Sequence, residues 1–517
     1  MRNAPPSKNL TLKVEDFGPI IEAEIDLRPL TVFAGPSNTG KSWLAILIYA
    51  LHRYIEEIDS PYFLDRVLFS RLSKRNEISK EEIDTFIDSL GVSSKEKYDS
   101  SDSGKIIDLP DFIVNAISKY LERSNERFAN HICRALGIED RRYLIRHSTR
   151  QNHASISLIK KINCSNKEIL NRLFVFKGDE LDVVKNDLPR TVFMNNSLIE
   201  RISNRIDDER DDSTDSDELI MRHRRLLSLI ARQCIASWVD PLSRSISYLP
   251  AGRTGIMRAH TSIVSAVISN AASSILPSTS PPAQITGTLA DFLEQMISID
   301  SSAYRRRRFS HHVRSDRIMK DHSAEIEKNI IDGKIEVIRS PHINYPEITY
   351  RPKGWKRSIP LLNTSSMISE LAPIVLFIRH KVMEGSVLII EEPESHLHPA
   401  MQVELTQQLA ALVGSGVRVI LTTHSEWILE SLSNIVYSYS LKDISRSNIP
   451  DVEIALNPEQ VGIWLFKKKK SPKGSVVEEM TWEKENGIYR SDYEAISENL
   501  YNKNASIYNE IHNGEIQ

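Results

Sequence analysis

The chain has little of several features that define whole classes of proteins. It contains only three cysteines, Cys133, Cys164 and Cys234, and no C-x-x-C spacing, which argues against a disulfide framework or a zinc site. No stretch approaches the roughly 18 uninterrupted apolar residues of a membrane helix, and no signal peptide follows Met1. The 66 basic and 69 acidic residues leave a net charge of −3, so the overall charge of the chain does not indicate binding to nucleic acid. We therefore expect a cytoplasmic protein without a membrane partner.

One short motif stands out. Residues 35–42 form a complete G-x-x-x-x-G-K-[ST] sequence between a strand-like run, 30–34, and an apolar, helix-like run, 42–50. Its glycines let backbone N–H groups face phosphate oxygens, its lysine reaches the β- and γ-phosphates, and its serine offers a hydroxyl to Mg²⁺ at a helix N-terminus. A chance glycine-rich turn fits this strand and helix context poorly. The residues predicted to bind the nucleotide are Gly35, Pro36, Ser37, Asn38, Thr39, Gly40, Lys41 and Ser42.

A second candidate element lies far along the chain. The apolar run 387–390 ends in Glu391 and Glu392, as expected of a buried parallel strand whose carboxyl end faces a ligand. One carboxylate would hold Mg²⁺ through its water shell, and the next would orient and polarise an attacking water. Taken alone, the two acids also fit the first turn of a capped helix. The next apolar run, 417–422, is followed by His424, which we expect beside the acid-tipped strand.

Together these motifs resemble the ABC-type P-loop ATPases that include recombination-mediator, SMC and OLD (overcoming lysogenisation defect) proteins. The run Glu-Glu-Pro-Glu-Ser-His-Leu-His-Pro at 391–399 resembles the OLD-like branch in particular. The resemblance implies an α/β fold: an ABC-type ATPase head, with a mixed sheet and flanking helices, interrupted by a large, mainly helical insertion lobe. The expected segments are 1–55 (head with phosphate loop), 56–240 (insertion), 241–330 (link back with a basic segment) and 331–517 (second half of the head).

The resemblance also implies cofactors and site roles. ATP and Mg²⁺ would be bound, with Ser42 and Glu391 at the metal. Lys41 would contact the β- and γ-phosphates, Glu392 would be the general base, and His424 would be a switch histidine at the γ-phosphate. Glu391 stands where the family more often has aspartate. Its extra methylene moves the carboxylate, which implies slow turnover.

Members of this family close two nucleotides between two protomers, and a serine-bearing loop contributes in trans. The matching segment here is 363–367, with either Ser365 or Ser366 in that role; an ordinary serine helix cap is an equal alternative. Arg253 lies in a segment, 248–255, that resembles one of OLD-like ATPases. It either senses phosphate or DNA or only buttresses its turn. We expect a homodimer or a higher even oligomer.

The long interval between the two halves of the site carries no sustained heptads and no transporter signature, which favours an OLD-like ATPase. The residues after His424 are too few for a Toprim domain and lack its D-x-D motif, so the chain is not expected to be a nuclease by itself. Stand-alone members of this size resemble ATPase subunits of anti-phage systems of the Septu or PARIS type. That implies a separately encoded nuclease or Toprim effector and a phage-protein trigger. The alternative is a DNA-repair or recombination clamp, in which the basic runs 305–308 and 467–470 contact DNA non-specifically instead of being solvated faces.

Overall fold

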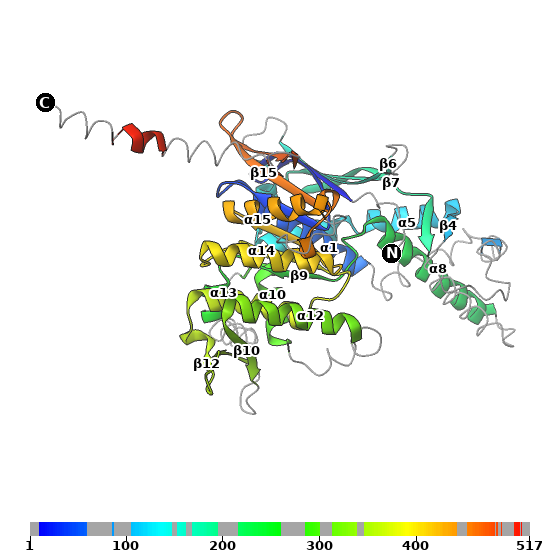
Figure 1. The fold of residues 1–517 in the computed structure, drawn as a ribbon. Coiled ribbons are helices and arrows are strands. Elements are labelled where there is room, and N and C mark those ends of the chain that lie inside the picture. The colour runs from blue at the N-terminus through cyan, green and yellow to red at the C-terminus, as the bar shows by residue number, and fades with distance from the viewer. Residues whose placement is uncertain are drawn as a thin grey trace, which may run out of the picture.

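The computed structural model is drawn in Figure 1. It describes residues 10–58, 85–86, 105–146, 152–161, 168–194, 216–259, 285–299, 313–338, 346–441, 452–480, 482–483, 487–488, 501–506 and 508. Among these residues, eleven strands form one mixed sheet in the order β7-β6-β5-β1-β2-β16-β15-β3-β14-β13-β9. The strands are β1 (Thr11–Phe17), β2 (Ile20–Asp26), β3 (Leu30–Ala34), β5 (His153–Lys161), β6 (Glu168–Lys177), β7 (Glu180–Asp187), β9 (Ile246–Leu249), β13 (Val387–Glu391), β14 (Arg418–Thr423), β15 (Val461–Lys469) and β16 (Gly474–Glu479).

Helices cover both faces of this sheet. The sheet separates two hydrophobic cores. The helices that contribute to the core on one face are α1 (Lys41–Ile58), α5 (Asp111–Arg123), α6 (Asn125–Leu136) and α8 (Ser216–Trp238). The opposite face carries α10 (Gly287–Ile297), α12 (Val313–Ile326), α13 (Ser366–His380), α14 (Pro399–Gly414) and α15 (Glu426–Tyr437). Short helical turns are η2 (Arg141–Leu144), η3 (Glu327–Ile331), η4 (Leu361–Asn363), η5 (Ser438–Leu441), η6 (Val452–Ile454) and η7 (Pro458–Gln460). Smaller sheets pair β10 (Gly333–Ile338), β11 (Glu347–Pro352) and β12 (Ile359–Pro360), β4 (Lys105–Asp108) with β8 (Thr191–Met194), and β17 (Trp482–Glu483) with β18 (Gly487–Ile488). This arrangement confirms the predicted α/β class with a mixed sheet and flanking helices.

The centre of the sheet is parallel and fully buried. Strand β14 lies between β3 and β13 and runs parallel to both, with Glu391 opposite Thr422 and Thr423 opposite Ala34. Alternate residues of β13 enter different cores: Val387 packs on the side of α1, and Leu388 packs on the side of α13. Since the carboxyl ends of parallel strands meet at one edge, this topology brings the phosphate loop, the paired acids and the histidine together.

The rest of the sheet is mixed. The hairpin of β15 and β16 joins β3 to β2, with β15 parallel to β3 and antiparallel to β16. Strands β5, β6 and β7 extend the head sheet beyond β1. The described part of 56–240 therefore combines helices with strands of the head sheet itself. The four-segment division remains a prediction.

Several polar or charged segments of the sequence lie outside the described residues. These are 93–104, 274–282, the arginine run 305–308 and most of the acidic stretch 207–218. The end of that acidic stretch belongs to α8, which begins at Ser216. Among the described helices, none combines the length and the apolar character that crossing a bilayer requires.

Candidate active site

The loop between β3 and α1 has the curled backbone that its sequence predicts. Gly35, Asn38 and Gly40 all have positive φ angles, of 132°, 60° and 101°. A Cβ atom on Gly35 would lie 2.7 Å from the carbonyl oxygen of Phe466, and one on Gly40 would lie 2.8 Å from Cγ1 of Ile20. Both glycines are therefore required by backbone conformation and by close packing.

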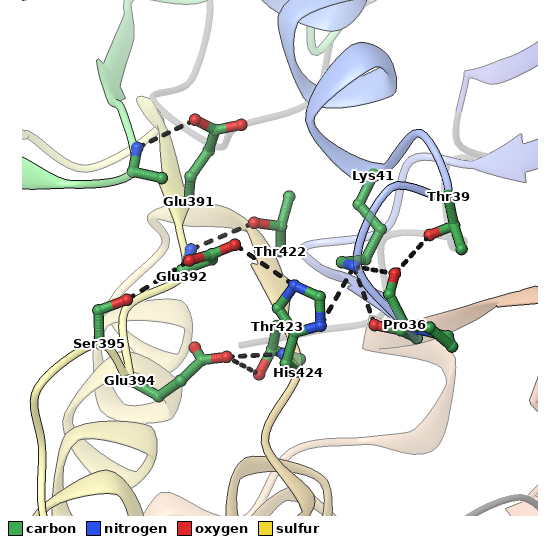
Figure 2. Close-up of polar contacts among 12 residues, drawn as sticks. Pro36, Thr39, Lys41, Glu391, Glu392, Glu394, Ser395, Thr422, Thr423 and His424 are labelled. Carbon is green, nitrogen blue, oxygen red and sulfur yellow. Dashed lines mark hydrogen bonds and ion pairs between the residues drawn. The ribbon is translucent and has the colours of Figure 1, made fainter. Parts of the chain in front are cut away.

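Lys41 is held inside this loop (Figure 2). Its ammonium donates hydrogen bonds to the carbonyl oxygens of Gly35 (2.9 Å) and Pro36 (2.8 Å), and it lies 3.5 Å from Nδ1 of His424. Burial lowers the pKa of Lys41 to about 8, and the nearby carboxylate of Glu392 opposes that shift. The cation is thus buried and positioned by backbone oxygens at the mouth of the loop.

Glu392 and His424 form a polar pair at the ends of adjacent strands. His424 Nε2 lies 3.3 Å from Glu392 Oε1, and the hydrogen bond between them lowers the pKa of the glutamate. The backbone of Glu392 is strained, with a φ of 43°, and its N–H donates to the carbonyl oxygen (3.0 Å) and the hydroxyl (3.1 Å) of Thr422. The carboxylate is therefore kept ionised and directed to the histidine, and its role as general base remains a prediction.

Glu394 is a site residue that the sequence analysis missed. One of its carboxylate oxygens accepts hydrogen bonds from the backbone N–H of His424 (2.6 Å) and from the hydroxyl of Thr423 (2.8 Å). Burial raises the pKa of Glu394. The sequence feature that could have identified Glu394 is its position in the run 391–399, which by itself indicates only a resemblance to a family. In the structure, Glu394 fixes the chain where β14 delivers the histidine.

Glu391 points away from its neighbour. Figure 2 shows Glu392 directed to His424 and Glu391 directed to the backbone after β9. Glu391 Oε2 accepts a hydrogen bond from the N–H of Ala251 (3.0 Å), while its buried Oε1 makes no hydrogen bond to any described residue. The Tyr248 hydroxyl lies beside this carboxylate, and burial raises its pKa well above the usual value.

The pocket above the loop has a volume of about 840 Å³. Ser42 lines it at the N-terminus of α1, together with Glu392 and His424. Glu391 does not line it, and its carboxylate oxygen without a hydrogen-bond partner is buried. The roles of Ser42 and Glu391 as metal ligands remain predictions.

Arg253 is a buttress in this structure. Its side chain is fully buried, and its guanidinium donates to the carbonyl oxygens of Pro250 (2.9 Å) and Glu391 (2.6 Å). It also forms an ion pair with Glu370 of α13 (2.8 Å). Of the two roles left open by the sequence, phosphate or DNA sensing and support of the turn, the structure favours support, because no part of the guanidinium reaches the surface.

The two candidate signature serines begin α13. The exposed Ser365 is the N-cap, and its hydroxyl accepts a hydrogen bond from the N–H of Ile368 (3.4 Å). Ser366 is half-buried, and its carbonyl oxygen accepts a hydrogen bond from the hydroxyl of Thr254 (3.0 Å). The helix cap is therefore present, and a contribution of either serine in trans remains a prediction.

The pocket also has an apolar wall that no sequence motif indicated. Trp43, Ile138, Tyr143 and Ile145 line it, and Tyr143 is 58 % exposed. Tyr143 lies in η2, which is far from the phosphate loop in sequence. Only the folded chain brings this aromatic ring to the pocket.

Backbone and charge contacts hold the wall in place. The N–H of Gly18, in the turn between β1 and β2, donates to the carbonyl oxygen of Leu144 (2.8 Å). The N–H of Arg146 donates to the carbonyl oxygen of Asp16 (2.9 Å), and its guanidinium pairs with the carboxylate of the same aspartate (2.6 Å). Because that turn also packs on the phosphate loop, the wall and the loop form one framework.

A family model described as "AAA ATPase domain" matches residues 10–429, which include both halves of the site. The chain belongs to the AAA ATPase domain family. It is thus a P-loop ATPase, from a family that implies use of a nucleotide and usually of Mg²⁺. No curated protein matches the sequence of this ATPase.

Solved structures of SMC heads show a weak similarity to this ATPase. A structure described as the Smc head bound to the C-terminal winged-helix domain of ScpA has 12 % identity and a TM-score of 0.40, over 92 % of this chain and 99 % of that one. The SMC head domain from Thermotoga maritima has 10 % identity and a TM-score of 0.34, with the same coverage. A Smc head with an extended coiled coil, bound to the C-terminal domain of ScpA and derived from Pyrococcus furiosus, has 11 % identity and a TM-score of 0.36, over 95 % and 99 %.

Proposed function

We propose that this ATPase is a nucleotide-dependent sensor and scaffold that dimerises through ATP and controls a separately encoded effector in bacterial anti-phage defence. The ATP-dependent part of this proposal rests on one observation. Lys41, Glu392 and His424 lie close together at one edge of the sheet and line the same pocket. A cation that binds the phosphates and a carboxylate that can position the attacking water are groups that phosphoryl transfer to water uses, and the imidazole adds a polar group within reach of both.

Each residue has a distinct task in this proposal. Lys41 leaves the carbonyl oxygens of its own loop and binds the β- and γ-phosphates. Glu392 accepts the proton of the attacking water, and His424 contacts the γ-phosphate and reports its presence to β14. Ser42 and Glu391 would hold Mg²⁺, which supplies charge neutralisation at the phosphates when bound.

The apolar wall of the pocket is the proposed binding surface for the nucleobase. Tyr143 is an exposed aromatic residue of the pocket, and Trp43 and Ile145 line the same pocket beside the phosphate loop. Aromatic side chains stack on bases with a stabilisation of about 1–3 kcal/mol. We infer that the base stacks on Tyr143 while the triphosphate occupies the loop.

Dimerisation is the expected consequence of ATP binding. The exposed N-cap Ser365 is accessible to a second copy of the chain, as a contribution in trans would require. A Glu392→Gln variant should bind ATP without hydrolysing it, because an amide cannot accept the proton of the water. With ATP it should therefore accumulate as a dimer or higher even oligomer.

The test is light-scattering mass measurement of Glu392→Gln with and without ATP. The matched control is the double variant Lys41→Ala/Glu392→Gln, which lacks the phosphate-binding cation and should show no response to ATP. A dimer that forms without ATP would mean constitutive pairing through another surface, with ATP changing only its shape. A monomer under all conditions, or hydrolysis by Glu392→Gln at the parent rate, would contradict the proposal.

The defence role rests on the resemblance of the 391–399 run to OLD-like ATPases. It predicts that the chain co-purifies with the product of a neighbouring gene, and that cleavage of nucleic acid appears only when that partner is present. A phage protein would be the trigger. Metal-dependent cleavage by the purified chain alone that survives Lys41→Ala would contradict this division of labour.

The alternative, a DNA-repair or recombination clamp, has one observation in its favour. Lys468, Lys469 and Lys470 are exposed at the end of β15, whereas Lys467 pairs with Glu478 (2.9 Å). These lysines can contact phosphates without base specificity. Salt-dependent binding of duplex DNA by the isolated chain, lost on changing the three lysines to glutamate, would favour this alternative over the defence role.

A further inference from the structure

The turn between β11 and β12 has an unusual composition for an exposed segment. Residues 353–357 read Lys-Gly-Trp-Lys-Arg, and all five are exposed, with the Trp355 side chain 60 % accessible. Figure 1 shows the small sheet of β10 and β12 projecting beyond α12 and α13 at one end of the molecule. A single exposed indole is ordinary on a protein surface, but one that stands beside adjacent cations offers a stacking face together with positive charge.

The turn is well defined despite its exposure. The N–H of Trp355 donates to the carbonyl oxygen of Pro352 (3.0 Å), and the N–H of Lys353 donates to the carbonyl oxygen of Asp332 (3.0 Å). Gly354 supplies a positive φ of 80°, with open space around it. The indole and its flanking cations are thus presented on a fixed backbone, which lowers the entropy lost on binding.

The charge of the turn is strongly one-sided. Residues 351–357 contain four cations and no acid. Arg351 pairs with Glu336 (2.5 Å), and Lys353 lies 3.6 Å from Asp332. Within the described part of the chain, Lys356 and Arg357 make no ion pair. Two uncompensated cations therefore stand next to an exposed aromatic ring.

We propose that this turn, residues 353–357, is a contact site for single-stranded nucleic acid. Trp355 stacks on an unpaired base, and Lys356 and Arg357 bind the flanking phosphates. Every base offers a π face, so the contact needs no particular sequence. The proposal is independent of the defence role and of the β15 lysines.

Two other polyanionic partners fit the turn less well. In a DNA duplex the base faces are already stacked, so the indole would have no ring to pack on. A membrane surface would suit the cations, but stable attachment needs more apolar insertion than one indole flanked by glycine and lysine provides. The combination of one exposed ring with adjacent unpaired cations selects a flexible strand with accessible bases.

The test is fluorescence anisotropy with a labelled dT20 strand and the full chain at low salt. Trp355→Ala should weaken binding about tenfold, as expected for the loss of one stacking platform. Trp355→Phe should retain much of the affinity. The matched control is Trp427→Ala, because Trp427 is also 50 % exposed but lies on α15, which has no lysine or arginine. All three variants should keep the parent ATPase rate and thermal midpoint.

Charge reversal supplies a second readout. Lys356→Glu/Arg357→Glu should weaken dT20 binding and reduce the slope of log K against log salt by roughly 1.4, about 0.7 for each lost phosphate contact. The control Lys177→Glu/Lys185→Glu reverses two exposed cations of β6 and β7 and should leave the slope unchanged. The proposal is overturned if dT20 does not bind, or if Trp355→Ala and Trp427→Ala behave alike. Binding of only duplex DNA or anionic phosphatidylserine vesicles would overturn it as well.

Discussion

The guanidinium of Arg253 and the carboxylate of Glu370 lie 2.8 Å apart, and both side chains are completely buried. The pair connects the end of β13, where Arg253 bonds to the carbonyl oxygen of Glu391, to the first turns of α13. The second oxygen of Glu370 accepts from the N–H (2.8 Å) and the hydroxyl (2.7 Å) of Thr254. Because Ser365 is the N-cap of α13, this pair links the paired acids of one half of the site to the surface proposed to meet a second copy.

Glu370→Gln should destabilise the protein by about 3–5 kcal/mol, because it leaves the Arg253 charge buried without a counter-ion. The change keeps the size of the side chain, so lost packing does not contribute. The measurement is the midpoint of urea or thermal unfolding.

The control is Glu478→Gln, which removes the partner of Lys467 in an exposed pair and should change the stability by less than about 1 kcal/mol. Equal, small effects of the two variants would show that the buried pair does not hold β13 to α13.

The local elements of this fold were predictable because each carries its own pattern. The apolar runs that became β3, β13 and β14 are short and lack helical periodicity, and those of β13 and β14 end in polar residues. The phosphate loop was predictable because its conformation requires glycine at Gly35 and Gly40. The place of His424 followed from the expectation that its strand adjoins the strand with the paired acids.

Other features depend on contacts between distant segments, which no local pattern encodes. Phe466 packs on Gly35 only because β15 lies beside β3, and the β15–β16 hairpin was not expected there. Tyr143 reaches the pocket through the contact of η2 with the β1–β2 turn. Arg253 was ambiguous because an arginine near a turn suits both a ligand and a buried partner, and Glu370 had no signal at all.

Nucleotide affinity should fall as the pH rises above about 8. In the free protein burial lowers the pKa of Lys41 to about 8, so the ammonium loses its proton above that pH, and binding a triphosphate must then restore it. The affinity should decrease by up to about tenfold for each further pH unit, and binding at pH 8.5 should take up protons. Isothermal titration calorimetry in buffers of different ionisation enthalpy measures both effects.

The lowered pKa of Lys41 also determines how the stability of the folded protein depends on pH. The folded pKa lies below the unfolded value of 10.5, so the free energy of unfolding should carry a penalty below pH 8 that disappears as the pH rises toward 10.5. Lys41→Arg is the control, because arginine stays charged throughout this range and should remove the pH dependence of binding. A parent protein with constant affinity between pH 7 and 9.5 would contradict the assignment of Lys41.

Glu394→Ala should slow hydrolysis by about 100-fold with little change in ATP affinity. The substitution removes both hydrogen bonds that fix the backbone of His424 and the hydroxyl of Thr423, and small displacements of positioned groups cost rate more than binding. Glu394→Gln should retain most of the activity, because its amide oxygen can accept the same two bonds. Steady-state kinetics separate kcat from KM. Equal loss in the alanine and glutamine variants would mean that the charge, and not the positioning, matters.

Tyr143→Ala should weaken ATP binding about tenfold and leave the affinity for tripolyphosphate unchanged. The ring is 58 % exposed at the wall of the pocket, so its removal deletes a stacking surface without opening the core. Tyr143→Phe should bind ATP as the parent does, since it keeps the ring. Competition titrations with ATP and tripolyphosphate against a fluorescent nucleotide give both affinities. If the alanine variant loses affinity for both ligands equally, Tyr143 supports the phosphate loop through the β1–β2 turn and does not contact the base. If it loses affinity for neither, the base lies elsewhere in the pocket, and the wall formed by η2 has no part in nucleotide recognition.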